Sequence, residues 1–276
     1  MKLKKKFDGL LLVSDIDNTL MIKDFIPEEN KKAIKYFTDN GGLFTIASGR
    51  NPVTAVSIAE SVGVNAPLIC VNGGMIYDKG SNKKLHNIFL TEKIDSYINI
   101  LLDKFPNLCY GYTTDDGYYF NSLELFYERF DSSIITEYIK KGYYKEGRPI
   151  GCPKNISKIV IADNEEQINK IEQYGNSLNL SEVLFVKTAT RFLEIIPKGV
   201  NKGIGVANLA HILNINNKNI FTIGDFDNDV EMLKNAEVSA CPDNSPQRIK
   251  DLATIIVKSC EDGAVADFIS YIDSLY

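Results

Sequence analysis

Acidic side chains stand directly after two apolar runs of this sequence. Asp15 and Asp17 follow the first run, and Asp225 and Asp229 follow a run near the other end of the chain. Continuous apolar runs are typical of strands in a parallel sheet, and such sheets bind ligands beyond the carboxyl ends of their strands. Carboxylates gathered there would repel one another without a cation, and clusters of oxygen atoms are the ligands that Mg²⁺ prefers. The positions of these acids therefore predict a magnesium site.

Other polar residues occupy comparable positions. Ser48 and Asn72 each follow a predicted strand, and Lys202 opens a predicted helix. Taken one at a time, such residues have plainer interpretations, because a serine can cap a helix, a first-turn lysine can be solvated, and an acid after a strand can form a local turn. Arg50 has two open interpretations, since it can reach a bound ligand or pair with a nearby acid. The combined set favours one site.

The alternation of acids from residue 225 to residue 229 also matches the start of an EF-hand calcium loop. That loop needs glycine at its sixth position and glutamate at its twelfth. This sequence has Val230 and Ala236 at those positions, so an EF-hand is excluded.

The elements that must position these residues alternate between strands and helices. In the first part of the chain, strands are predicted at 10–13, 43–47 and 68–71, with one helix beginning near Pro27 and another over 52–62. This alternation predicts an α/β fold with a doubly wound, Rossmann-like parallel sheet.

The middle of the chain interrupts that alternation. Tyrosine-rich segments within 110–120 flank a turn-like pair of aspartates and predict a hairpin. Further strands of this middle part are predicted at 157–162, 183–187 and 192–196, with a helix near 165–174 between them. The opening alternation resumes after Pro197, with strands predicted at 220–223 and 254–257 and helices near 202–213 and 229–236. We therefore predict a core domain made of residues 1–82 and 198–276, with an inserted α/β domain of residues 83–197.

The bulk composition is typical of a folded, soluble protein without affinity for polyanions. The chain has 276 residues, of which 44% are hydrophobic and 24% charged, far from the composition of disordered proteins. Its formal net charge is −5 and it has no long basic run beyond Lys4 to Lys6, so neither nucleic acid nor an anionic membrane is a predicted partner. No stretch approaches the roughly 20 apolar residues of a membrane span.

The cysteines predict a cytoplasmic location. The five cysteines lie far apart and form no Cys-x-x-Cys pair, which argues against a zinc site and against a disulfide framework. Reduced thiols are typical of the cytosol. The basic start followed by an apolar run imitates a secretory signal, but the run is short and ends in Ser14-Asp15, so a buried strand is the better interpretation.

Four ordered motifs resemble those of the haloacid dehalogenase superfamily. In chain order they are Asp15-Ile16-Asp17-Asn18-Thr19-Leu20, Ser48-Gly49-Arg50, Lys202-Gly203 and Gly224-Asp225-Phe226-Asp227-Asn228-Asp229. More narrowly, the chain is similar to the Cof-type (subfamily IIB) sugar phosphatases, whose large C2-type α/β cap is inserted between the second and third motifs. The resemblance extends over essentially the whole chain and implies a Rossmann-like core with an inserted cap.

The resemblance implies phosphoryl transfer by two catalytic carboxyl groups. Asp15 would attack phosphorus and form an aspartyl-phosphate, which divides one difficult displacement into two easier ones. Asp17 would protonate the leaving oxygen and then activate the hydrolytic water. Dehalogenases of the superfamily lack this second acid, so Asp17 favours a phosphatase that acts on a small phosphate ester.

The same resemblance implies ligands for Mg²⁺. The carboxylates of Asp15 and Asp225 and the backbone carbonyl of Asp17 would hold the metal ion. Asp229 would be a further ligand or a supporting residue behind the ligands.

Ligands for the phosphoryl group follow from the resemblance as well. Ser48 and Lys202 would bind its non-bridging oxygens, with Asn228 assisting them. Asn18 stands where many relatives carry glycine. We expect that difference to change the local turn and to leave the reacting groups in place.

Two other functions use a similar set of residues. A phosphomutase of the same superfamily needs the same groups but depends on a bisphosphate activator. A phosphoaspartate signalling module or sensor also surrounds an aspartate with acids, a serine and a lysine, but it needs neither Asp17 nor a large inserted domain. The sequence leaves the substrate open among hexose phosphates, smaller sugar phosphates, flavin mononucleotide and pyridoxal phosphate, and it does not predict the oligomeric state.

Overall fold

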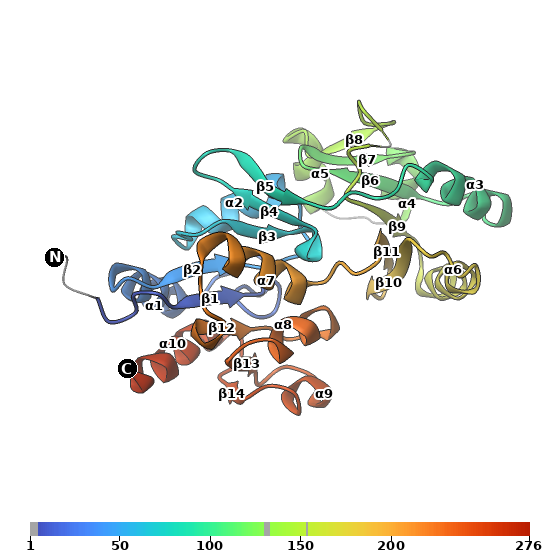
Figure 1. Ribbon diagram of the computed structural model, residues 1–276. Helices are drawn as coiled ribbons and strands as arrows, with labels where there is room; N and C mark the ends of the chain where they lie inside the picture. The colour runs from blue at the N-terminus through green and yellow to red at the C-terminus, as the bar shows by residue number, and fades with distance from the viewer. Residues whose placement is uncertain (1–4, 130–132, 153) are drawn as a thin grey trace. The chain divides into compact units, whose positions relative to one another are not determined.

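The chain forms two compact units in the computed structural model, which describes residues 5–129, 133–152 and 154–276 (Figure 1). The first unit contains the chain up to Arg50 together with Ala55–His86 and Asn201–Tyr276. The second unit contains Asn51–Thr54 and Asn87–Val200. The predicted boundaries at 82/83 and 197/198 stay a prediction of the domain organisation.

A parallel sheet forms the centre of the first unit. Its order is β14-β13-β12-β1-β2, and neighbouring strands run parallel. The strands are β1 (Leu11–Ser14), β2 (Leu43–Ile46), β12 (Ile220–Ile223), β13 (Val238–Pro242) and β14 (Ile255–Val257). Because β1 lies between β12 and β2, the carboxyl ends of β1 and β12 meet at one edge of the sheet. The predicted parallel sheet is confirmed, although the sequence pattern does not predict β13.

A three-stranded sheet of order β3-β4-β5, in which β3 and β4 run antiparallel, adjoins the parallel one. Its strands are β3 (Leu68–Cys70), β4 (Met75–Asp78) and β5 (Lys83–Asn87). An isolated parallel bridge between Ala47 and Ile69 connects β3 to the end of β2. The third predicted strand therefore lies where the two sheets meet.

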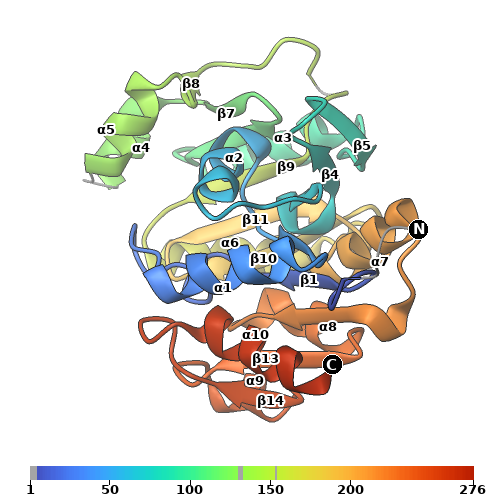
Figure 2. The same cartoon turned by 90° about the vertical axis from the view of Figure 1, so that its left-hand side faces the viewer.

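Helices cover both faces of the parallel sheet. Those of the first unit are α1 (Glu28–Asp39), α2 (Pro52–Ser61) from Ala55 onward, α7 (Lys202–Leu213), α8 (Val230–Lys234), α9 (Gln247–Lys250) and α10 (Ala264–Leu275), with the 3-10 turns η1 (Val71–Gly73), η2 (Asn217–Asn219) and η3 (Asp227–Asp229). α1 and α10 lie side by side (Figure 2). The predicted helix near 229–236 is thus a 3-10 turn followed by the short α8.

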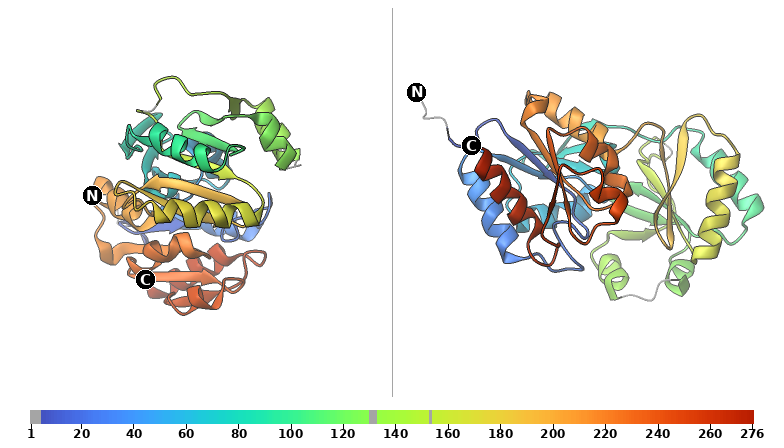
Figure 3. Two further views of the ribbon diagram at one scale, coloured as in Figure 1. Left: turned by 90° about the vertical axis from the view of Figure 1, so that its right-hand side faces the viewer. Right: turned by 90° about the horizontal axis from the view of Figure 1, so that it is seen from below.

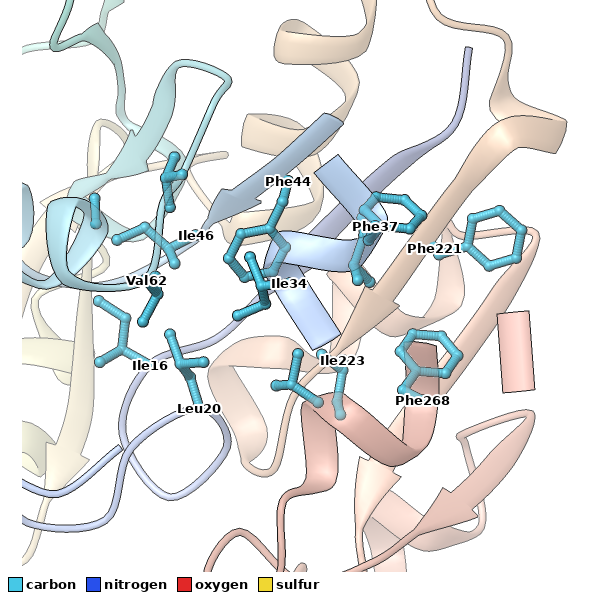
Figure 4. Packing of buried hydrophobic residues seen from close by; sticks show 14 of the residues in the cluster. Ile16, Leu20, Ile34, Phe37, Phe44, Ile46, Val62, Phe221, Ile223 and Phe268 are labelled. Carbon is cyan, nitrogen blue, oxygen red and sulfur yellow. The ribbon is translucent and has the colours of Figure 1, made fainter. Parts of the chain in front are cut away.

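The core of the first unit lies on the two faces of this sheet. Phe44 and Phe221 pack with Phe37 of α1 and Phe268 of α10 on one face (Figure 4). On the other face, Leu11 packs against α7 in a second apolar cluster. Burial on both faces explains why β1 and β12 read as unbroken apolar runs in the sequence.

The second unit is built on a sheet of order β10-β11-β9-β6-β7-β8. Its elements are α3 (Ile94–Lys104), β6 (Tyr110–Thr114), β7 (Gly117–Phe120), α4 (Leu123–Arg129), α5 (Ser133–Lys140), β8 (Tyr144–Glu146), β9 (Lys158–Ala162), α6 (Glu165–Ser177), β10 (Val183–Ala189) and β11 (Phe192–Pro197). α3 and α6 pack on one face of the sheet (Figure 3). The predicted tyrosine-rich hairpin is confirmed as the antiparallel pair β6 and β7.

The α/β class predicted from the sequence is confirmed by both units. Within the described part of the chain, no helix combines the length and the apolar character needed to cross a membrane.

Candidate active site

Asp15 lies immediately beyond the carboxyl end of β1. Its backbone N–H donates to the carbonyl of Ile223, the last residue of the neighbouring strand β12, at 2.9 Å. Its side chain is only 8% exposed. The central position of β1 in the sheet therefore fixes Asp15 at an edge where residues from β12 also end.

The loop after β12 brings two further carboxylates to this edge. Asp225 is nearly buried and Asp229 is fully buried. The Oδ2 atom of Asp229 accepts the backbone N–H groups of Asp225 at 3.0 Å and Phe226 at 3.2 Å, so its carboxylate holds the loop from the inside. A Cβ atom on Gly224 would lie 2.5 Å from the Asp229 carboxyl carbon, which explains the glycine at that position.

Lys202 joins the two strand ends. It is the first residue of α7 and is completely buried. Its Nζ atom donates to Asp15 Oδ1 at 2.5 Å and to Asp229 Oδ1 at 2.7 Å. Asn201 caps this helix by accepting the N–H of Ile204 at 2.9 Å. The cap fixes the first turn of the helix and therefore the position of Lys202. The interpretation of Lys202 as a solvated first-turn lysine is therefore wrong.

The charges of this cluster are not balanced. Burial raises the pKa of Asp15 well above its usual range, the charges of Asp229 and Asp225 act in the same direction, and Lys202 opposes them. Burial also raises the pKa of Asp225 to about 6. For Lys202, burial lowers the pKa, but the charges of Asp15 and Asp229 outweigh this effect and the pKa is raised. One ammonium among three carboxylates leaves an excess of negative charge that a cation would relieve.

The donor atoms fit a hard divalent cation. Carboxylate oxygens of Asp15, Asp225 and Asp229 lie within 4.8 Å of one another. Oxygen-only donors of this kind suit Mg²⁺, whereas zinc sites are usually built with cysteine or histidine. The residues present therefore fit the magnesium ion that the sequence predicts.

Asp17 lies apart from the cluster. Its side chain is 54% exposed and forms a two-point ion pair with Arg50, whose Nη2 donates to Oδ1 at 2.7 Å and whose Nε donates to Oδ2 at 3.3 Å. Of the two interpretations left open for Arg50, the structure shows the pairing with a nearby acid. A planar guanidinium bound at two points fixes the orientation of the carboxylate.

Ser48, Asn72 and Asn228 form a chain of polar contacts. Ser48 is buried, its Oγ accepts the N–H of Arg50 at 3.2 Å, and its carbonyl accepts the N–H of Asn72 at 2.9 Å. Asn228 Nδ2 lies 3.5 Å from Asn72 Oδ1. Asn72 adopts a left-handed backbone conformation with φ of 52°, which asparagine tolerates better than most residues. The structure thus connects predicted phosphate ligands from two separate motifs.

Thr19 is a site residue to which the sequence assigned no role. Its Oγ1 donates to Asp225 Oδ1 at 2.9 Å, and its side chain is fully buried. The threonine stands in the first motif, but its partner lies 206 residues away, so spacing gives no signal for this contact. It ties the loop after β1 to the loop after β12.

Comparison with known proteins supports the resemblance of the motifs. A family model described as haloacid dehalogenase-like hydrolase matches residues 12–269. The chain is 26% identical over 277 residues to the 5-amino-6-(5-phospho-D-ribitylamino)uracil phosphatase of Bacillus subtilis, covering 92% of this chain and 95% of the relative. It is also 26% identical over 267 residues to the HMP-PP phosphatase of Yersinia pseudotuberculosis, covering 95% and 94%.

A solved structure shares the fold. A haloacid dehalogenase-like hydrolase from Bacteroides thetaiotaomicron matches with a TM-score of 0.83 and 19% sequence identity, covering 97% of this chain and all of that one. Its agreement with both units supports the fold of a parallel-sheet core with an additional sheet domain.

Proposed function

The chain belongs to the haloacid dehalogenase-like hydrolase family, and on this premise we propose that it is a Mg²⁺-dependent phosphatase acting on a small phosphorylated metabolite. The observation that carries the proposal is the buried cluster at the ends of β1 and β12. There Asp15 lies against Lys202, with Asp225 and Asp229 within reach of the same cation. The phosphatases among the relatives support the same reaction type.

The proposed reaction begins with Asp15 as the nucleophile. One of its carboxylate oxygens bonds to phosphorus while the bond from phosphorus to the leaving oxygen breaks, and Asp17 gives a proton to that oxygen. In the second half, Asp17 takes a proton from water, whose oxygen bonds to phosphorus while the bond from phosphorus to the Asp15 oxygen breaks. The products are inorganic phosphate, the free alcohol and the original Asp15 carboxylate.

Charge stabilisation would come from the residues around the nucleophile. Lys202 would donate to the phosphoryl oxygens as their charge changes, and Ser48 and Asn228 would bind the same group through their polar side chains. Arg50 would keep the Asp17 carboxylate oriented. When bound, Mg²⁺ would reduce the repulsion between the Asp15 carboxylate and the phosphate.

A sugar phosphate or a related phosphate monoester is the substrate class we propose. The Bacillus relative is named for a phosphoribityl compound, which is a phosphate ester of a sugar alcohol. The inserted residues 83–197 would act as the cap that excludes water and selects the substrate. Buried free thiols such as Cys70 and Cys241 support the proposed cytoplasmic location.

A phosphomutase of the same superfamily is the nearest alternative, because it needs the same reacting groups. Free phosphate released without a bisphosphate activator would exclude it. A sensor without turnover is disfavoured by the oriented Asp17, which a switch that only stores a phosphoryl group does not need.

The first test is phosphate release from a generic aryl phosphate. The wild type and Asp15→Asn should be compared, each with Mg²⁺ and with a chelator. We expect release only from the wild type with Mg²⁺, since the amide cannot act as the nucleophile. Activity of Asp15→Asn equal to that of the wild type would overturn the assignment of Asp15.

A second variant tests the general acid. Asp17→Asn should lower kcat by about 10²- to 10⁴-fold, the usual contribution of proton transfer by a positioned side chain. Its divalent-ion affinity, measured by calorimetry, should match that of the wild type because the Asp17 carboxylate lies outside the cluster. A matching loss of metal binding would contradict the assigned role.

A further inference from the structure

The loop between Asp225 and Asp229 is held from its outer side by an arginine of another element. Arg248 of α9 donates from Nε to Asp227 Oδ1 at 2.7 Å and from Nη2 to Asp227 Oδ2 at 2.9 Å. Its guanidinium carbon also lies 5.1 Å from the centre of the Phe226 ring. One side chain thus contacts the first two residues after Asp225, Phe226 and Asp227.

These contacts complement those on the inner side of the loop. Inside, the Asp229 carboxylate accepts the N–H groups of Asp225 and Phe226. On the outer side, the Asp227 side chain is 58% exposed, and Arg248 is the partner that holds it in place. A bidentate arginine bond fixes direction as well as distance. The backbone carrying both metal-site carboxylates is therefore held on two sides.

Arg248 itself extends from an anchored helix. The next residue, Ile249, is fully buried and packs with Leu233 of α8 and Cys241 of β13. Strand β13 is the neighbour of β12, the strand that leads into the loop. The arginine is consequently fixed to the same sheet that positions Asp225.

We propose that Arg248 is a positioning residue for the metal site, which it preorganises through Asp227 and Phe226. This inference rests on the proposed function, because it assumes that Asp225 and Asp229 serve a divalent cation. Residues that orient metal ligands from behind typically change metal affinity by about 10- to 100-fold. Arg248 is half exposed and acts through the loop backbone, so we expect a smaller effect, about three- to tenfold.

The test measures metal binding directly. Mg²⁺ titration by calorimetry and Mn²⁺ binding by electron paramagnetic resonance should be carried out on the wild type, Arg248→Met and Arg248→Lys without substrate. We expect Arg248→Met to bind both ions about three- to tenfold more weakly. Arg248→Lys, which keeps the charge but loses the two-point bond, should restore at most part of the affinity.

Arg148→Met provides a matched control. Arg148 also forms an exposed ion pair, with Asp95 in the second unit, and its removal should leave metal affinity unchanged. Thermal unfolding in chelator distinguishes a purely structural role, since loss of stability alone would lower the Tm without changing the binding constant. Wild-type affinity in Arg248→Met would overturn the inference and leave the proposed function intact. Failure of the wild type itself to bind either ion would overturn both.

Coupling between the two partners gives an independent readout. If Arg248 acts through Asp227, Arg248→Met and Asp227→Asn should not add, and the double variant should bind Mg²⁺ about as well as the weaker single variant. Fully additive losses would show that Arg248 does not act through Asp227 and would contradict the inference.

Discussion

Both units bury a lysine ammonium, but the carboxylates around the two ammonium groups differ. Lys202 of the first unit contacts Asp15 and Asp229, with Asp225 close by. Lys158 of the second unit pairs with Glu194 across the sheet, and both side chains are at least nine-tenths buried. Among the residues that the structure describes, acids close enough to share a metal ion occur around Lys202 and not around Lys158.

The difference separates a binding site from a structural ion pair. Lys158 lies on β9 and Glu194 on the adjacent β11, where they are diagonal neighbours on one face of the sheet. A matched pair of this kind compensates its own charge. The cluster around Lys202 has surplus carboxylates, and their charge is what the proposed Mg²⁺ would compensate. Buried charge by itself therefore does not indicate a site, whereas an excess of one sign does.

Removing the lysine of the matched pair should have the largest effect on stability. Lys158→Met removes the ammonium that pairs with the buried Glu194 carboxylate, and breaking a buried ion pair from one side typically costs about 3–5 kcal/mol. Urea unfolding followed by circular dichroism should show this decrease, while Mg²⁺ binding to the folded protein should stay unchanged. A decrease below about 1 kcal/mol would indicate that water reaches the pair.

The matched control replaces both partners. Lys158→Met combined with Glu194→Met removes both charges and keeps apolar volume, and such replacements are often neutral or stabilising. We expect the double variant to recover most of the lost stability. If it remained as unstable as the single variant, packing rather than charge would explain the effect.

Removing the lysine of the unmatched cluster should affect catalysis. Lys202→Met removes the proposed donor to the phosphoryl oxygens, and we expect this loss to lower kcat by about 10²- to 10³-fold. Mg²⁺ affinity should not weaken, because the remaining carboxylates lose a competing cation. Steady-state kinetics with an aryl phosphate and calorimetric Mg²⁺ titration would measure the two quantities, and a joint loss of turnover and Mg²⁺ affinity would instead mean that the cluster had collapsed.

The smallest predicted effect is a pH dependence of Mg²⁺ affinity, which we expect at the carboxylate cluster around Lys202 and not at the Lys158–Glu194 pair. The pKa of Asp225 is raised to about 6, so protons compete with Mg²⁺ below that pH. Between pH 7 and pH 5 the affinity should fall by about tenfold, equivalent to about 1.4 kcal/mol. Calorimetric titrations across this range provide the measurement. Asp225→Asn is the control, since it should bind Mg²⁺ weakly and lose the part of the pH dependence that comes from Asp225, which leaves only the part from Asp15, whose pKa burial also raises.

The raised pKa of Asp225 also determines how the stability of the metal-free protein changes with pH. A carboxyl group whose pKa is higher in the folded protein contributes stability below its unfolded value of 3.8, and that contribution is lost as the pH rises through about 6. Metal-free protein therefore loses this contribution on approaching neutral pH. The increase in Tm caused by Mg²⁺ should accordingly be larger at pH 7 than at pH 5, and the opposite trend would contradict the raised pKa.

Sequence patterns predicted some strands well and missed others for identifiable reasons. β1 and β12 are buried on both faces, so their residues are uniformly apolar and easily recognised. β13 is also buried but contains Ser239, whose hydroxyl lies 3.3 Å from that of Thr254. That contact satisfies the hydrogen-bonding hydroxyl of Ser239 within the core. The serine interrupts the apolar run, so the sequence pattern does not predict this strand. β5 is polar and largely exposed, which explains why it was not predicted.

The sequence by itself determined which residues stand at the strand ends, since runs of apolar side chains and the motifs after them are local properties of the chain. Only the tertiary structure decided how these residues pair. Lys202 meets Asp15 across 187 positions, Arg50 meets Asp17 across 33, and Arg248 meets Asp227 across 21. Such ion pairs depend on which strands become neighbours in the sheet. Electrostatic attraction is set by the distance between charges in space and does not depend on their separation along the chain.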